Sequence, residues 1–153
     1  MGNIIYISGN KTLLNKIEPL WQQLNEHHLK VSPYFKDYYQ TMTFDDRKRL
    51  EFQRAWGGEF RVDIAMDGLV PVGYCLCSID RWQMGEIDSI FVDEKYRHQG
   101  IGSTLMKNAL AWLTEKGAKK KIVTVAIGNE EAWKFYAQFG FLPRRTLLEQ
   151  KKP

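Results

Sequence analysis

The chain has 153 residues, with 22 lysine and arginine residues against 18 aspartate and glutamate residues, for a net charge of +4. This length fits one compact domain, and a composition that is 44% hydrophobic and 13% aromatic excludes a disordered chain. The small charge excess forms no basic stripe typical of a nucleic-acid binder, and no apolar run approaches the ~20 residues that a membrane span needs.

The first part of the chain predicts one strand followed by helices. A short β-rich run over residues 3–8 indicates the strand. Apolar residues then recur at three- and four-residue steps over 13–29, which predicts an amphipathic helix that Pro19 kinks or divides. An aromatic-rich connection over 31–43 leads to Thr43, which can cap a second helix.

The rest of the chain predicts mostly strands, at residues 60–66, 70–79, 85–92, 121–127 and 141–149. Asp67 and Gly68, between the first two of these, form a hairpin turn signal. One helix is opened by Gly100, Ile101 and Gly102 and ends at Gly117, and a shorter one spans 129–139. The element order therefore predicts a single α/β domain without internal repeats.

The two cysteines give no sign of a disulfide framework or a zinc site. Cys75 and Cys77 alternate to the same face of one expected strand, and the chain has no other cysteine. We therefore expect no metal and a reducing, cytoplasmic location. The N-terminus has no basic and apolar leader pattern, so we expect no signal peptide.

The strongest functional signal is a glycine loop between an expected strand and an expected helix, which consists of Arg97, His98, Gln99, Gly100, Ile101 and Gly102. Its two glycines let a ligand approach the backbone, and the helix that follows offers free N–H groups to a pyrophosphate. Ser103 and Thr104 can add hydroxyl donors. A dinucleotide fingerprint would need glycine in place of Leu105, and the Gly-Lys-Ser/Thr of a P-loop is absent.

This loop resembles the Arg/Gln-x-x-Gly-x-Gly/Ala signature of the GNAT superfamily of N-acetyltransferases. A second stretch resembles that family's Asn-x-x-Ala-x-x-Phe-Tyr-x-x-x-Gly-Phe pattern and contains Asn129, Ala132, Phe135, Tyr136, Gly140 and Phe141. The resemblance covers roughly the C-terminal half, while the N-terminal half matches only in element order. It implies a mixed α/β fold whose central, mostly antiparallel sheet is flanked by about four helices.

The resemblance also implies acetyl-CoA as cosubstrate, without a metal. It divides the single domain 1–153 into a substrate side, 1–58, and an acetyl-CoA-binding core, 59–153. The expected contacts to acetyl-CoA come from the strand end, the loop and the second motif: Ile90, Phe91, Val92, Arg97, His98, Gln99, Gly100, Ile101, Gly102, Ser103, Thr104, Asn129, Ala132 and Phe135.

Two residues are the expected acid–base catalysts. A lysine-like amine with a pKa of ~10.4 is mostly protonated at pH 7, so the enzyme must remove a proton. Glu86 lies eleven positions before Arg97, the spacing at which histone-acetylating relatives place their general base. Asp88, on the same strand face, is the alternative base or a binding group for a cationic substrate. Tyr136 is the expected general acid for the departing thiolate.

The acceptor stays open between small amines and protein amines, and so does the oligomeric state, although many GNAT relatives form homodimers through terminal strands. The first helices hold aromatic and acidic residues that would suit a cationic amine: Trp21, His27, His28, Tyr34, Phe35, Asp37, Tyr38, Tyr39, Phe44, Asp45 and Asp46. The same aromatics are also compatible with an ordinary core. A non-catalytic acyl-CoA sensor or scaffold with this fold is the alternative function.

Overall fold

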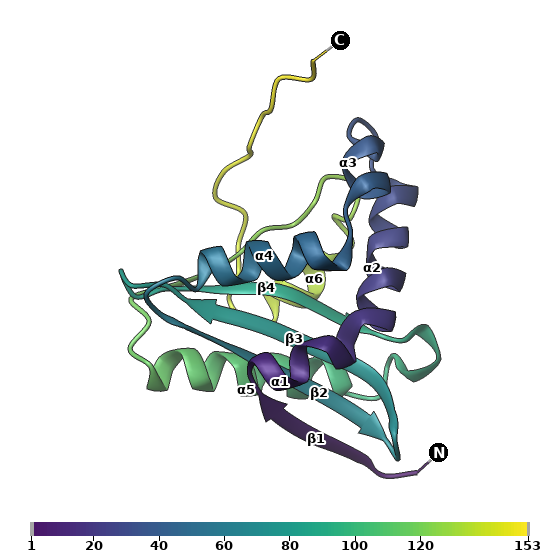
Figure 1. The fold of residues 1–153 in the computed structure, drawn as a ribbon, viewed down its shortest axis with the longest axis vertical. Coiled ribbons are helices and arrows are strands. Elements are labelled where there is room, and N and C mark those ends of the chain that lie inside the picture. Colours follow the sequence, from purple (N-terminus) through teal and green to yellow (C-terminus); the bar gives the residue numbers. More distant parts are fainter. Residues whose placement is uncertain (1, 153) are drawn as a thin grey trace.

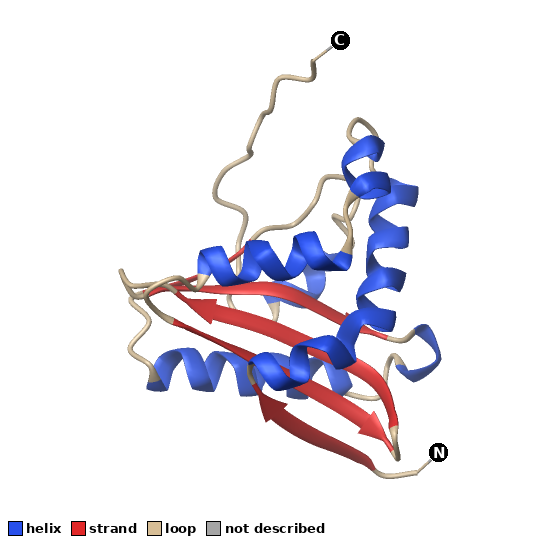
Figure 2. Cartoon of the chain, in the orientation of Figure 1, coloured by secondary structure: helices blue, strands red, loops and turns tan. Residues whose placement is uncertain are grey.

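The computed structural model describes residues 2–152, and its centre is one five-stranded sheet (Figures 1 and 2). The strand order is β1-β2-β3-β4-β5, and neighbours are antiparallel except for β4 and β5. The strands are β1 (Ile4–Gly9), β2 (Glu59–Asp67), β3 (Val70–Ile79), β4 (Met84–Val92) and β5 (Lys120–Val123). The expected mixed, mostly antiparallel sheet is therefore confirmed.

Helices cover both faces of this sheet and bury two hydrophobic clusters. One face carries α1 (Lys11–Leu14), η1 (Asn15–Ile17), α2 (Glu18–Val31) and α4 (Phe44–Arg54), while α3 (Lys36–Thr41) packs against α2. The opposite face is covered by α5 (Ile101–Glu115), whose apolar stripe packs on the sheet. The short elements η2 (Glu94–Tyr96) and α6 (Ala132–Ala137) lie on either side of α5 in the chain.

Several local signals determine where these elements begin and end. Pro19 occupies the first turn of α2, so the predicted long helix is divided into α1, η1 and α2. Thr43 caps α4 as predicted: its hydroxyl accepts from the Asp46 amide at 3.1 Å, and the Asp46 carboxylate accepts from the Thr43 amide at 3.0 Å. Gly68, with φ +61°, turns the β2–β3 hairpin.

The structure differs from the sequence prediction at several segments. The strand predicted over 121–127 ends at Val123, and the helix predicted over 129–139 is regular only over Ala132–Ala137. Residues 36–41, expected as part of a connection, form α3. The strand predicted over 141–149 does not form: the segment has no regular structure and extends away from the sheet (Figure 1), and Leu142, Leu147 and Leu148 are exposed. A strand needs a neighbour for its backbone groups, and Pro143 removes one of the donors that such pairing would use.

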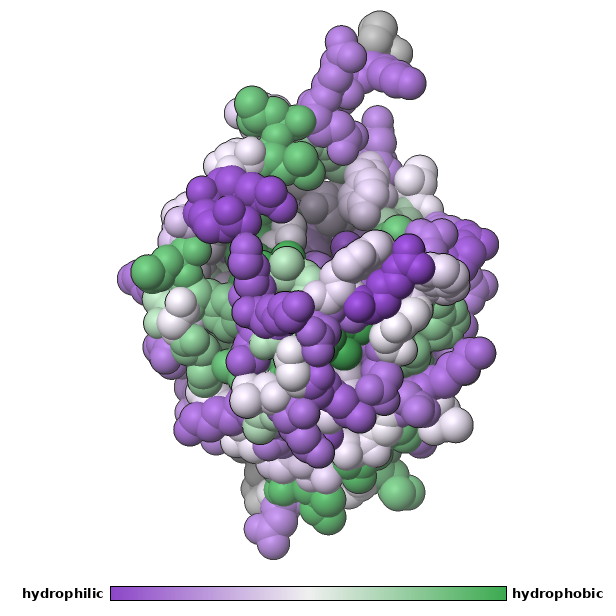
Figure 3. Space-filling view, turned by 90° about the vertical axis from the view of Figure 1, so that its left-hand side faces the viewer, coloured by the Kyte–Doolittle hydropathy of each residue, from purple (hydrophilic) through white to green (hydrophobic). Residues whose placement is uncertain are grey.

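The space-filling view shows hydrophobic side chains scattered among hydrophilic ones on the face that it presents, without one large apolar area (Figure 3). Among residues 2–152, no helix is long and apolar enough to cross a membrane.

Candidate active site

The candidate site begins where two parallel strands separate. Only Met84–Ile87 of β4 pairs with Lys120–Val123 of β5. The remaining part of β4, residues 88–92, therefore has no β5 partner within the described chain, and its backbone edge is open on that side. A strand edge of this kind offers N–H and C=O groups to a ligand.

A β-bulge lies at the start of the open edge. Cys77 pairs with Ile87, but the preceding residue Leu76 pairs with Ser89, so Asp88 is the extra residue in β4. A bulge redirects side chains and is frequent near active sites. The Asp88 side chain has no exposed area although the residue as a whole is half-buried, so its exposure comes from its backbone at this edge.

The N-terminus of α5 follows β4 and is not capped by a side chain in the described structure. The first helical hydrogen bond runs from the Thr104 amide to the Gly100 carbonyl, at 3.0 Å. The amides of residues 101–103 have no carbonyl one turn earlier in the helix to accept their hydrogen bonds. The first turn also contains no acidic residue. This end of α5 is therefore suited to an anion such as a pyrophosphate.

The two loop glycines have different roles. Gly100 has φ +83°, and a Cβ added there would meet nothing within 4 Å, so this position is next to open space. A Cβ at Gly102 would lie 3.4 Å from the Phe135 ring, so Gly102 allows α6 to pack closely against α5. His98 also has a left-handed φ of 62°. The predicted loop and the second motif are thus brought together.

Side-chain contacts anchor this loop to the end of β4. The Arg97 Nε donates to the Val92 carbonyl at 2.9 Å, and the guanidinium lies 5.3 Å from the centre of the Phe91 ring. The Thr104 hydroxyl, expected as a donor to the ligand, instead donates to the Gly100 carbonyl at 3.1 Å. Ser103 is half-buried beside it.

Tyr136 lies on α6, against the core that α5 covers. Its ring meets the Phe135 and Phe141 rings edge to face, at centroid distances of 5.5 and 6.3 Å. Burial, with a smaller contribution from Cys75, raises the pKa of Tyr136 to about 12. The hydroxyl is therefore protonated at neutral pH, as an unperturbed tyrosine would also be.

Asn129 connects the second motif to the helices on the other side of the site. Its side-chain oxygen lies 3.2 Å from Nε2 of His27, on α2. The Asn129 carbonyl accepts from the Ala132 amide at 3.1 Å, which begins the turn that leads into α6. The sequence did not predict the contact to α2, because it joins residues 102 positions apart.

Glu86 and Asp88 lie on one face of β4 as predicted, but only one of them reaches solvent. The exposed fraction of the side chain is 20% for Glu86 and 0% for Asp88. Arg54, at the end of α4, lies 3.9 Å from Glu86 and 3.3 Å from Asp88. Burial, then the charge of Asp88, raises the pKa of Glu86, while Arg54 and Arg47 oppose that increase.

Three charged residues of α4 that the sequence prediction missed complete this cluster. They are Arg47, Glu51 and Arg54, and Glu51 has no exposed surface. Their spacing of four and three residues puts them on one helix face. Charged residues at the three- and four-residue spacing of a helix face that packs on the core were the sequence signal that could have revealed them.

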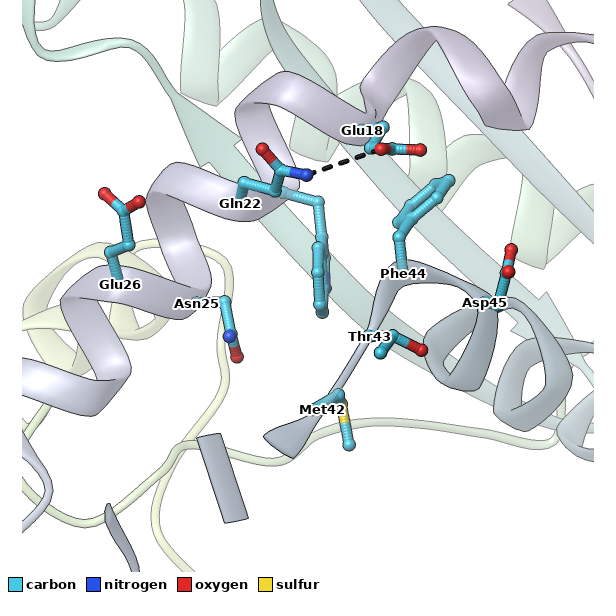
Figure 4. Close-up of a pocket in the computed structure, with 9 residues that line it drawn as sticks. Glu18, Gln22, Asn25, Glu26, Met42, Thr43, Phe44 and Asp45 are labelled. Carbon is cyan, nitrogen blue, oxygen red and sulfur yellow. Dashed lines mark hydrogen bonds between the residues drawn. The ribbon is translucent and has the colours of Figure 1, made fainter. Parts of the chain in front are cut away.

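The predicted substrate region is split by the structure. Trp21 and Phe44 are buried in the core, whereas Tyr34 and Tyr38 are exposed. Between α2 and the start of α4 lies a cleft of about 400 Å³ (Figure 4). Its lining contains the acidic residues Glu18, Glu26 and Asp45 beside Trp21, Gln22, Asn25, Met42, Thr43 and Phe44.

This cleft is separate from the cluster of Glu86 and Arg54. It lies at the beginning of α4, whereas Arg54, which contacts Glu86, is ten residues further along the helix, roughly 15 Å at 1.5 Å per residue.

Comparisons with known proteins agree on one family. Residues 21–141 match the model of the acetyltransferase (GNAT) family. Human N-alpha-acetyltransferase 30 is 33% identical over 89 residues, which are 56% of this chain but only 25% of that protein. The matched part thus spans a quarter of the length of this curated relative.

Two solved structures share the fold along nearly the whole chain. The aminoglycoside N-acetyltransferase AAC(6')-Iy in complex with CoA has a TM-score of 0.72 at 20% identity, with 99% of this chain and 97% of that one covered. A ribosomal-protein-alanine N-acetyltransferase from Brucella melitensis has a TM-score of 0.63 at 16% identity, with 99% and 100% covered.

Proposed function

We propose that this chain, which belongs to the acetyltransferase (GNAT) family, transfers the acetyl group of acetyl-CoA to a primary amine by direct attack in a ternary complex. The observation that carries the proposal is the juxtaposition of an uncapped α5 N-terminus, an open β4 edge and the partly buried Tyr136. These supply a seat for pyrophosphate, backbone groups for an extended pantetheine arm, and a proton donor for a thiolate.

The residues present fit coenzyme A. The open space beside Gly100 leaves room for phosphate oxygens against the amides of 101–103. Backbone groups of residues 90–92 on the open β4 edge would bind the pantetheine amides, apart from the Val92 carbonyl, which accepts from Arg97, and an N–H of this edge would polarise the thioester carbonyl. The CoA complex of AAC(6')-Iy, which shares the fold, supports the same use here.

The proposed reaction transfers one acetyl group and removes two protons from the acceptor nitrogen. Glu86, acting through water, removes the first proton from the ammonium form of the acceptor, and the neutral amine attacks the thioester carbon. As the tetrahedral intermediate collapses, its nitrogen loses the second proton to solvent, the C–S bond breaks, and the Tyr136 hydroxyl gives its proton to the departing thiolate. Glu86 then returns its proton to Tyr136 through solvent.

Glu86 is favoured over Asp88 as the base because it alone has exposed carboxyl surface. A general base must reach the proton that it removes, directly or through one water. The Asp88 carboxyl is enclosed by Arg54, Glu51 and Ser78.

The first acceptors to test are N-terminal α-amines of peptides. The names of the human relative and of the Brucella melitensis structure refer to N-alpha and ribosomal-protein-alanine acetylation. An α-amine has a pKa near 7.7–8.0, so roughly one molecule in ten is already neutral at pH 7, against one in several thousand for lysine. Aminoglycosides and polyamines form the second group.

The test combines calorimetric titration with acetyl-CoA and a free-thiol assay over these amine groups. Micromolar binding together with amine-dependent thiol release is the expected result. Binding without thiol release on any amine would favour the alternative function, a sensor or scaffold that binds acyl-CoA. Absence of binding would overturn both.

A further inference from the structure

Two carboxyl groups meet in the interior between α4 and β4. The Glu51 carboxyl is fully buried and lies within hydrogen-bonding reach of Asp88, whose side chain is also unexposed. Both Glu51 oxygens and one Asp88 oxygen have no donor among the described residues. Two ionised carboxylates in such contact would repel each other without solvent to screen them.

The surrounding charges allow one negative charge on this pair. Arg47 Nη2 lies 3.9 Å from the Glu51 carboxylate and donates to the Asp88 backbone carbonyl at 2.8 Å. Arg54 lies between Asp88 and Glu86. One charge on the pair and one on Glu86 balance the two arginines, whereas a doubly ionised pair leaves an uncompensated buried charge.

We propose that Glu51 and Asp88 share one proton in the folded protein, and that the pair is a positioning device that holds Arg54 against Glu86. The shared proton supplies one donor and so pairs two of the three unpartnered oxygens with each other. The pair forms because Asp88 lies on the face of β4 that α4 covers, where Arg47 donates to its backbone carbonyl and Arg54 contacts its carboxylate. The positioning role rests on the proposed function of Glu86, while the shared proton does not.

The charged and polar groups on the elements packed around Glu51 and Asp88 agree with a shared proton. Burial, then the charge of Asp88, raises the pKa of Glu51 well above its usual range, and burial also raises the pKa of Asp88. The opposing groups are Arg47 and Arg54 on α4 and the Ser78 hydroxyl on β3. Asp80, beyond the end of β3, acts on Glu86 in the same direction as Asp88.

The first test detects the shared proton without using enzyme activity. Urea unfolding of the wild type and of Glu51→Gln is measured between pH 5.5 and 7.5. The unfolded carboxyl is ionised in this range, so the folded wild type binds one more proton than the unfolded chain. Its unfolding equilibrium constant should therefore rise tenfold per pH unit relative to the variant. Parallel pH dependences would overturn the shared proton.

A direct measurement covers the case in which the variant fails to fold. The infrared spectrum of the folded wild type should contain a protonated-carboxyl band at pH 7, and Asp88→Asn should remove it, since the remaining carboxylate can then accept from the amide. Absence of the band from the wild type would contradict the proposal.

The positioning role is tested by the acid limb of the kcat/KM profile. Each single variant, Glu51→Gln or Asp88→Asn, keeps one negative charge on the pair, so the limb should stay in place. The double variant removes that charge and leaves the two arginines unbalanced, so the limb should move to lower pH. A merely structural role would lower activity without moving the acid limb. A single variant that moves the limb as far as the double variant would contradict the positioning role.

If Glu86→Gln turns over like the wild type, the assignment of Glu86 as the base fails, while the shared-proton result from urea unfolding remains valid.

Discussion

The environments of Tyr136 and Gly100 bear on two different steps of the proposed reaction. Tyr136 would be protonated at neutral pH even with the ordinary tyrosine pKa of ~10, and burial raises its pKa to about 12, while a departing CoA thiolate, with a thiol pKa near 8.5, needs a proton. Gly100 lies beside open space with a left-handed φ, so its contribution is to ligand approach rather than to core packing. Chemistry and binding can therefore be separated by single substitutions.

Tyr136→Phe should leave acetyl-CoA affinity unchanged and lower kcat about 100-fold, because general acid catalysis contributes factors of this size. Steady-state kinetics and calorimetry measure the two effects. Tyr6→Phe, on the edge strand β1, is the matched control and should have wild-type kcat. Equal turnover in the Tyr136 variant would remove this residue from the mechanism.

Gly100→Glu should abolish acetyl-CoA binding, because the new carboxylate fills the open space beside the α5 N-terminus and repels the pyrophosphate. Gly68→Glu is the matched control: Gly68 also has a positive φ, +61°, and open space around it, but lies in the β2–β3 hairpin. The control should bind normally. Retained affinity in a folded Gly100 variant would exclude the loop as the pyrophosphate site.

At the scale of elements, α4 connects the N-terminal helices to the reacting strand. Its first turn is held by the capping box of Thr43 and Asp46, and its last turn brings Arg54 to Glu86. The sequence predicted the cap from residues three positions apart. It did not predict that Arg47 would reach the Asp88 carbonyl, because that contact depends on how α4 lies across β4.

Thr43→Ala should lower the free energy of unfolding by about 1 kcal/mol, the usual contribution of a helix N-cap. Urea unfolding at pH 7 measures this change. Thr41→Ala provides a comparison, since the Thr41 hydroxyl donates to the Asp37 carbonyl within α3 and caps no helix start. Equal losses in the two variants would argue against a specific role for the capping box.

At the scale of the whole molecule, two hydrophobic cores pack on opposite faces of one sheet and meet at the candidate site. The core between α5 and the sheet contacts Tyr136 and the glycine loop. The core between α2–α4 and the sheet lies on the face that carries Glu86. His28 belongs to the second side, stacked on Tyr39 at a centroid distance of 5.4 Å, and its Nδ1 has no partner in the described structure. Burial, then His27 and Arg47, lowers the pKa of His28 to about 4.

His28 should therefore make the fold sensitive to mild acid. The unfolded chain binds the His28 proton below pH 6.5, whereas the folded chain binds it only near pH 4, so this stability is lost as the pH falls between these values. We expect the wild type to lose about 2 kcal/mol more than His28→Gln between pH 7 and pH 4.5, less than the full linkage because the ring is partly exposed. Equal losses in urea unfolding would contradict the assignment.

Most elements of the fold follow from local sequence signals, because helix periodicity, caps and hairpin turns depend on residues a few positions apart. The β2–β3 hairpin and the α5 start with its loop are confirmed on that basis. The predicted strand over 141–149 was wrong because β-propensity alone does not supply a pairing partner. The roles of Glu86 and Tyr136 and the acetyl-CoA contacts remain predictions.

The sequence by itself determined the family and the loop suited to an anion, since both depend on contiguous motifs. Only the tertiary structure decided that Glu86 is exposed and Asp88 is enclosed, and that Glu51 lies against Asp88. These outcomes depend on the packing of α4 across β4, a long-range interaction that no short segment encodes.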